Sequence, residues 1–301
     1  MNALSTFVHL IPVTLATSLL YAFIALAILV PFRLLNFPDL TSEGAFPLGG
    51  MVGAALIIAG LNPFLATIVA ALAGAVAGAT TALIHLRFRI NTLLAGILVM
   101  TALYSVNLRV LGRANVTLFD QPSVYSLIDP AILTSDLAKT TVFGLLILAA
   151  LLGLWWFLQT EMGVRLRAVG ANATLAPALG ISVAAWTLCG LAIANAFAAF
   201  AGALLVQQQG FADVGMGFGV LISGLAAVVI GETILGRGSI LRILAGPVVG
   251  AVVYYQVVSL GLALGLHPSD LKLATAAFVL CALAVPALRG GAGDRREGLG
   301  A

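Results

Sequence analysis

Long apolar runs separated by short polar links dominate the pattern of this chain. Each run is close to the roughly 20 residues that a helix needs to cross a hydrocarbon core about 30 Å thick. The pattern therefore predicts an all-α fold, a polytopic transmembrane helical bundle of about nine spans, within a range of eight to ten. The predicted spans cover residues 12–32, 44–60, 63–85, 91–108, 139–158, 184–207, 218–235, 243–264 and 271–288.

The polar links differ in length, and this constrains how the spans connect. The link at Asn62 and Pro63 is so short that the second and third spans must form a tight antiparallel hairpin. The longest polar link, residues 109–138, is rich in Pro, Asp and Ser and is predicted to be an exterior loop with one short interfacial helix. Residues 1–301 are predicted to form a single transmembrane domain.

Composition supports lipid as the solvent of most of the chain. Charged residues make up 8% of it and apolar residues 61%, whereas about a quarter of a soluble protein is charged. Cys189 and Cys281 lie inside apolar runs, and the three histidines share no motif, so no metal site is predicted. The net charge of +3 does not indicate a nucleic-acid partner, because in a membrane protein the placement of positive charge matters more than its sum.

Basic residues predict the orientation, since they are retained on the cytoplasmic side during insertion. If the link at 33–43 is inside, most arginines fall inside, and the N-terminus is outside and the C-terminus inside. The basic residues then inside are Arg33, Arg87, Arg89, Arg165, Arg167, Arg237, Arg242, Arg289, Arg295 and Arg296. Those outside are Arg109, Arg113, Lys139 and Lys272.

Paired glycines indicate where helices approach closely, because helix association in lipid depends on small residues at the interface. Four pairs place two glycines on one helix face, although glycine is also simply common in membrane helices. These pairs are Gly49 with Gly53, Gly74 with Gly78, Gly246 with Gly250, and Gly261 with Gly265.

The segment at residues 160–183 lies between two spans on the predicted cytoplasmic side and is too polar to span. Its glycines, with Asn172 and Pro177, punctuate short helical pieces. A short helix held parallel to the membrane could fit a groove on a motor subunit, whereas the alternative is an ordinary solvated loop.

The same segment resembles the coupling-helix signature of ABC importer permeases of the branched-chain amino acid and ribose type. The shared pattern is T-x-x-G-x-x-x-R-A-x-G-x-N-x-x-x-A-x-x-x-G-I, which begins at Thr160 and ends at Ile181. The resemblance implies docking into an ATPase subunit. The residues implied in this contact are Thr160, Glu161, Gly163, Arg165, Arg167, Ala168, Gly170, Asn172, Ala176, Leu179, Gly180 and Ile181.

Two further stretches are similar to the same family, so the resemblance runs from about residue 15 to 288. One is the apolar run with G-R-G-S at residues 225–240, which departs from the family by placing Glu232 where a glycine is usual. The other is the polar break at residues 33–50. Its motif FPDLTxEG, together with residues 90–115, most closely resembles a subgroup that includes tryptophan and tyrosine importer permeases.

Acidic residues flank the polar break near Pro38, Gly44 and Pro47. Because an ionised group at the bilayer centre costs about 2.5–3.5 kcal/mol, such acids usually line protein or water cavities. They either form part of a translocation path or gate, or cap a helix at the membrane surface. The candidates for the path are Asn36, Asp39, Thr41, Glu43, Asn91, Thr92, Asn107 and Asn195, of which the asparagines and Thr92 could instead bridge helices.

Two other polar groups have structural interpretations. Glu232 is predicted to form an ion pair with Arg237 or with Arg242 of the next helix. The polar residues Gln207–Gln209 and Asp213 lie at the outer end of the sixth span, where they either contact a binding protein or are simply solvated at the interface.

No motif for ATP hydrolysis is present. A phosphate-binding loop needs Gly-Lys-Ser/Thr, and neither of the two lysines, Lys139 and Lys272, follows a glycine. The resemblance thus implies a non-enzymatic permease of the bacterial inner membrane that imports a small solute, best guessed to be an aromatic amino acid. Its implied partners are ABC ATPase subunits carrying ATP and Mg²⁺, a periplasmic or lipoprotein solute-binding protein, a second permease copy and membrane lipid. An ion-coupled secondary transporter or a membrane scaffold are the alternatives.

Overall fold

The computed structural model describes residues 3–128 and 135–267, with isolated positions at 270, 273, 276, 277 and 280. Within this part of the chain, eight helical segments are long and apolar enough to span a membrane. The elements are α1 (Ala3–Leu29), the π-helical turn η1 (Val30–Leu34), α2 (Thr41–Ile58), α3 (Pro63–Phe88), α4 (Thr92–Leu111), β1 (Asn115–Thr117), α5 (Val124–Ile128), α7 (Asp136–Gln159), α8 (Glu161–Ala171), η2 (Ala176–Leu179), α9 (Val183–Gln209), β2 (Phe211–Asp213), η3 (Val214–Gly217), α10 (Val220–Leu235) and α11 (Ile240–Ala263).

The first eight predicted spans are confirmed, with ends shifted by a few residues. The first runs from Ser5 to Leu34 and the seventh from Val214 to Leu235, both longer than the apolar pattern predicts. The ninth predicted span, 271–288, lies outside the described residues except for isolated positions. The short helix expected in the long link is present as α5, whereas the strand β1 beside it was not predicted.

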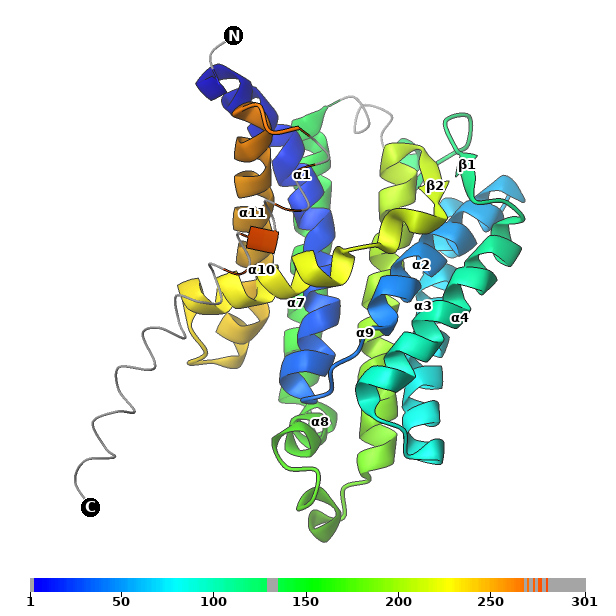
Figure 1. The fold of residues 1–301 in the computed structure, drawn as a ribbon, viewed down its shortest axis with the longest axis vertical. Coiled ribbons are helices and arrows are strands. Elements are labelled where there is room, and N and C mark those ends of the chain that lie inside the picture. Colours follow the sequence, from blue (N-terminus) through cyan, green and yellow to red (C-terminus); the bar gives the residue numbers. More distant parts are fainter. Residues whose placement is uncertain are drawn as a thin grey trace, which may run out of the picture.

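Helix α9 runs through the middle of the bundle (Figure 1). It packs against α2 and α3 on one side and α1 on the other, and α10 and α11 form a pair that packs on α1. The α8–η2 segment projects at one end of the bundle, and the antiparallel β1–β2 ribbon lies at the opposite end (Figure 1). The two ends of the molecule therefore carry different polar structures, joined by α9.

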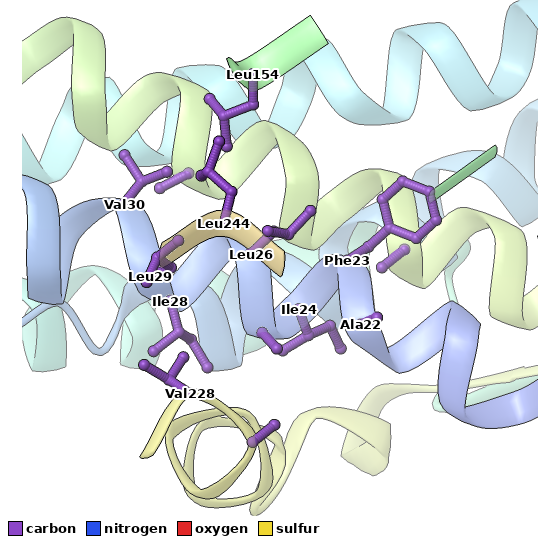
Figure 2. Close-up of a cluster of buried hydrophobic side chains, with 14 of the residues drawn as sticks. Ala22, Phe23, Ile24, Leu26, Ile28, Leu29, Val30, Leu154, Val228 and Leu244 are labelled. Carbon is purple, nitrogen blue, oxygen red and sulfur yellow. The ribbon is translucent and has the colours of Figure 1, made fainter. Parts of the chain in front are cut away.

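The second half of the first span is fully enclosed in the core. Figure 2 shows its side chains, Phe23 among them, surrounded by residues of other helices, such as Leu154 of α7, Val228 of α10 and Leu244 of α11. Every residue from Ala22 to Val30 is at most 1% exposed. Helix α1 therefore serves as a shared core element that neighbours on several sides cover.

Three of the four predicted glycine contacts are confirmed as close helix crossings. A Cβ on Gly49 would collide with the backbone of Ala199 on α9, and one on Gly78 with that of Leu191. On the other side of the molecule, a Cβ on Gly250 would collide with the backbone of Ala227. These positions admit no side chain, because the neighbouring backbone occupies the space that it would need.

The prediction for the fourth pair is wrong. Gly265 lies beyond the end of α11 with a positive φ of 93°, and a Cβ there would meet no atom of the residues that the structure describes within 4 Å. Within the described part of the chain, a Cβ on Gly261 would meet only the nearby Leu266 side chain. Gly261 lies in the last turn of α11 and Gly265 in the turn that follows, so the two do not share one helix face.

Candidate functional site

The α8–η2 segment begins with a helix whose start is fixed by its own side chains. The Thr160 hydroxyl accepts from the Gly163 amide at 3.4 Å, an N-cap that satisfies one of the free amides at a helix start. Glu161 and Arg165 pair one turn apart at 3.2 Å. Gly163, Leu166 and Val169 form its buried face, so α8 lies on the bundle with one side covered.

A compact turn follows α8 and leads into η2. The Asn172 side chain accepts hydrogen bonds from the amides of Thr174 and Leu175, both at 3.0 Å. Gly180 ends η2 with a positive φ of 72°, a conformation that favours glycine. These local bonds fix the shape of the turn, and Ala176 just after it is buried in the core of the bundle.

The segment is seated on the end of the first span. A Cβ on Gly170 would collide with the carbonyl of Leu34, the last residue of η1. The next residue, Leu35, packs against Gly190 of α9. Backbone therefore lies directly on backbone where α8 meets η1, and the two cannot move independently without opening a gap.

The outer surface of the segment is largely apolar. Four large apolar side chains of the segment are exposed. They are Met162, Val164, Leu175 and Leu179, with exposed fractions of 53%, 50%, 61% and 74%. Exposed apolar patches of this kind mark interaction sites. Of these four residues, only Leu179 is among those that the motif indicated.

The motif residues divide into two groups in the structure. Most of them shape the segment, as the caps, turns and close contacts above demonstrate. Arg167 belongs to this group too, because its Nη2 donates to the carbonyl of Leu158 at 3.1 Å and so holds the junction of α7 and α8. Glu161, Arg165 and Leu179 are exposed.

A second site lies inside the bundle around Asp39. Its carboxylate accepts from the Thr41 amide and from the Asn195 side-chain amide, both at 2.9 Å. The Thr41 hydroxyl is 2.7 Å from the hydroxyl of Thr81 on α3. All four side chains are fully buried, so this network joins α2, α3 and α9 away from solvent.

The position of Asp39 corrects the interpretation as a cap at the membrane surface. Asp39 does accept from the first amide of α2, as a capping residue would. However, its partner Asn195 is the thirteenth residue of α9, about 18 Å along that helix at 1.5 Å per residue. The link after η1 therefore returns into the bundle, and α2 begins near mid-depth.

Glu43 connects the start of α2 to the start of α10. Its Oε1 accepts from the amide of Gly219, the residue before α10, at 2.6 Å. A pocket of about 360 Å³ lies beside this contact, between α2, α4 and η3. Its lining includes Glu43, Tyr104, Asn107 and Phe218, so it combines aromatic surface with a few polar groups.

Of the remaining path candidates, Asn107 joins the pocket beside Glu43, whereas Asn36, Asn91 and Thr92 lie elsewhere. Asn107 is buried and donates to the Gly44 carbonyl at 3.4 Å, so it bridges α4 and α2. Asn91 caps α4 by accepting from the Leu93 amide, and Asn36 is exposed in the link after η1 with a φ of 52°. Thr92 is half-buried at the start of α4.

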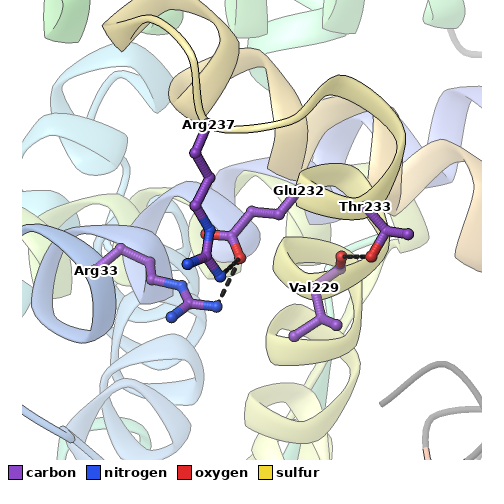
Figure 3. Close-up of polar contacts among 5 residues, drawn as sticks. All are labelled: Arg33, Val229, Glu232, Thr233 and Arg237. Atoms are coloured by element: carbon purple, nitrogen blue, oxygen red, sulfur yellow. Dashed lines mark hydrogen bonds and ion pairs between the residues drawn. The ribbon is translucent and has the colours of Figure 1, made fainter. Parts of the chain in front are cut away.

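A third polar cluster lies at the end of α10. Glu232 pairs with Arg237, which confirms one of the two predicted partners, at 2.8 Å. It also pairs with Arg33 of η1 at 2.6 Å, a contact across 199 positions that the sequence did not suggest. The prediction of Arg242 as a partner is wrong: between these two described residues no ion pair forms. Figure 3 shows both partner arginines directed at the one carboxylate.

At the opposite end of the bundle, Gln207 is not an interfacial residue. It is 5% exposed, accepts from the Val124 amide at 2.9 Å and donates to the Thr67 hydroxyl at 2.9 Å. It therefore ties α5 and α3 to α9. Both sequence interpretations of Gln207, solvation at the interface and contact with a binding protein, are wrong.

Comparison with known proteins gives a match over nearly the whole chain. The model of the family described as "Branched-chain amino acid transport system / permease component" matches residues 11–284. The match includes the α8–η2 segment, the Asp39 network and the Glu232 cluster.

Curated relatives agree with this match. The chain is 36% identical to a tyrosine transport system permease protein of Clostridioides difficile, over 89% of this chain and 88% of the relative. It is 34% identical to an uncharacterised protein of Rickettsia prowazekii, over 86% and 91% of the two chains. The ribose import permease protein of Escherichia coli is 26% identical over 73% and 72%. No solved structure matches the chain significantly.

Proposed function

This chain belongs to the family of branched-chain amino acid transport system permease components, and from that membership we propose that it is the membrane subunit of an ATP-driven importer. The family is one of multi-pass transport components and is not itself catalytic. Its relatives include permeases of ABC transporters, one of them for tyrosine. The direction of transport, the substrate and the partner subunits are the proposed part.

The α8–η2 segment carries the proposal. It presents Met162, Val164, Leu175 and Leu179 beyond the end of the bundle, on a scaffold fixed by caps and turns. An apolar surface rimmed by charge, as at Arg165, fits a groove on a protein partner. We assign this surface to an ATPase subunit that binds ATP and Mg²⁺, and place it on the cytoplasmic side.

The path for the solute is assigned to the region where α2 and α10 begin. Helices that start inside a bundle place polar backbone at depth, where it can line a cavity but not face lipid. The pocket beside Glu43 is large enough for a small metabolite, and Tyr104 and Phe218 offer ring surfaces to it. The proposed solute is an amino acid, with an aromatic side chain suggested by the tyrosine relative.

The full assembly has four further parts in this proposal. A second permease copy completes the pore, two ATPase subunits dock on the inner face, and a periplasmic or lipoprotein binding protein delivers the solute. The chain lies in the bacterial inner membrane with its N-terminus outside. Closure of the ATPase pair pushes on the α8–η2 segment and changes which side of the membrane the path opens to.

Uptake by a reconstituted complex tests this function. The chain would be co-expressed with candidate ATPase and binding proteins from the same genome, purified and placed in proteoliposomes. We expect ATP-dependent accumulation of radiolabelled tyrosine or another amino acid bound by the binding protein. Failure of the chain to co-purify with the ATPase, combined with uptake driven by an ion gradient alone, would instead support a secondary transporter.

A further inference from the structure

Helix α10 is held by a carboxylate at each of its ends. At its start, the amide of Gly219 donates to Glu43 of α2 at 2.6 Å. At its end, Glu232 accepts from Arg33 at 2.6 Å and from Arg237 at 2.8 Å. The first contact borders the pocket, and the second lies next to the α8–η2 segment through η1.

The two arginines on Glu232 differ in what they connect. Arg237 belongs to the turn between α10 and α11, so its ion pair stays within that hairpin. Arg33 belongs to η1, so its ion pair joins the hairpin to a different part of the molecule (Figure 3). The Glu232 side chain is only 6% exposed, and its attraction to Arg33 is therefore less screened than that of a surface pair.

Arg33 is adjacent to the tightest contact of the α8–η2 segment. The carbonyl of Leu34, the next residue, fills the space where Gly170 of α8 would carry a Cβ. A displacement of α8 must therefore carry the backbone at Leu34, and with it the neighbouring residue Arg33. The ion pair extends this connection to the end of α10.

The α10–α11 hairpin is built to move as a unit. A Cβ on Gly231 would collide with the backbone of Gly246, and one on Gly250 with that of Ala227. Because backbone lies on backbone at both points, the two helices cannot slide without a clash. A displacement at Glu232 is therefore passed along α10 towards Phe218 and Gly217, which line the pocket.

We propose that Arg33 and Glu232 are positioning residues that link the ATPase-docking segment to α10, and through α10 to the wall of the pocket. This proposal rests on the proposed function, because it needs a motor that moves α8. Arg237 has a different role: it neutralises Glu232 within the hairpin. Arg237 should also keep the Arg33→Ala variant folded, because the buried Glu232 carboxylate then still has Arg237 as a partner.

The test compares Arg33→Ala with Arg237→Ala in the reconstituted complex. Each variant removes one ion pair from the same carboxylate, so Arg237→Ala is the matched control. ATP hydrolysis and solute uptake are measured on the same proteoliposomes, and the readout is solute moved per ATP. We expect Arg33→Ala to lower this ratio about tenfold while hydrolysis continues, in line with measured coupling energies between sites, and Arg237→Ala to leave it within about twofold.

A charge exchange gives the second arm. Because Arg237 would repel an arginine at position 232, the exchange Arg33→Glu with Glu232→Arg is made together with Arg237→Ala. This variant remakes the link with reversed charges, and we expect its uptake per ATP to recover above that of Arg33→Ala. A purely structural role would lower thermal stability and uptake together and leave uptake per ATP unchanged.

Three outcomes decide the matter. Equal ratios for the two single variants, or loss of folded protein without a change in the ratio, would overturn the link. Wild-type complex that hydrolyses no ATP and moves no solute would overturn the proposed function itself, and with it the link. Wild-type transport with a selective defect in Arg33→Ala would support both.

Discussion

The α2–α9 crossing and the α8–η2 segment both depend on glycine, and they use it differently. At the crossing, Gly49 and Gly202 let two helices touch along their backbones, and nothing of that surface remains exposed. In α8–η2, Gly170 seats the segment and Gly180 turns the chain, while apolar side chains are left uncovered. The first arrangement serves stability, and the second leaves a surface for a partner. Substitutions should separate the two.

The largest effect is expected at the crossing. A Cβ on Gly202 would collide with the carbonyl of Phe46, so Gly202→Ala should lower the free energy of unfolding by about 3 kcal/mol, the upper end of the usual cost of overpacking. Thermal unfolding in detergent, followed by size-exclusion chromatography, measures this. Gly153→Ala on α7 is the matched control, because a Cβ there meets no described residue within 4 Å. Equal midpoints for the two variants would contradict the close crossing.

The next effect is expected at the buried network on the same side of the molecule. Asp39→Ala leaves the Thr41 amide and one Asn195 N–H without their acceptor and should cost about 2 kcal/mol of stability. Asp39→Asn keeps an acceptor oxygen and should cost less. Normal transport by Asp39→Ala at normal expression would remove Asp39 from the proposed path.

A smaller effect, and of another kind, is expected on the α8–η2 surface. Leu179→Ala should weaken binding of the ATPase subunit about tenfold, the loss typical of a central interface residue, while leaving thermal stability unchanged. Leu72→Ala on α3 is the control, since Leu72 is 61% exposed but lies within a membrane span. The affinity of the ATPase subunit is measured from its binding to permease that is held in nanodiscs and immobilised on a surface. If Leu179→Ala lowered the free energy of unfolding as much as the free energy of ATPase binding, Leu179 would stabilise the fold instead of contacting the partner.

The smallest effect is expected for the ion pair on the same segment. Glu161 and Arg165 are 87% and 53% exposed, so Glu161→Ala should cost about 0.3 kcal/mol, and less at high salt. Unfolding midpoints at low and high ionic strength would measure this. A cost above about 1 kcal/mol would indicate that the pair carries more of the segment's shape than the capping bonds do.

The spans and the α8–η2 segment could be predicted because their signals are local. Apolar length marks a span, and caps such as Thr160 and Asn172 act within a few residues. Three glycine pairs were found for the same reason, since one helix face carries the signal. The fourth pair, at Gly261 and Gly265, had the same spacing but lay where the helix ends.

The candidate site was harder to predict because it is made of contacts between distant residues. Asp39 meets Asn195 only because the link after η1 folds back into the bundle, and no local pattern reports that path. Arg33 on Glu232 and the inward-facing Gln207 were missed in the same way. Gln207 accepts from the buried Val124 amide, and Arg33 adds a second partner to the buried Glu232 carboxylate. Pairing buried polar groups is a requirement on the fold as a whole and not on a short window of sequence.

Helix α9 holds one anchor at each level of the bundle: Gly190 against Leu35, Asn195 on Asp39 and Gln207 beneath α5. A transport cycle that rocked this helix would have to release all three together. The Asn195 and Gln207 contacts lie away from η1, so this part of α9 can stay in place while the α8–η2 segment, η1 and the α10–α11 hairpin move. Distance measurements during turnover would then use α9 as the stationary reference point, and report motion as change relative to it.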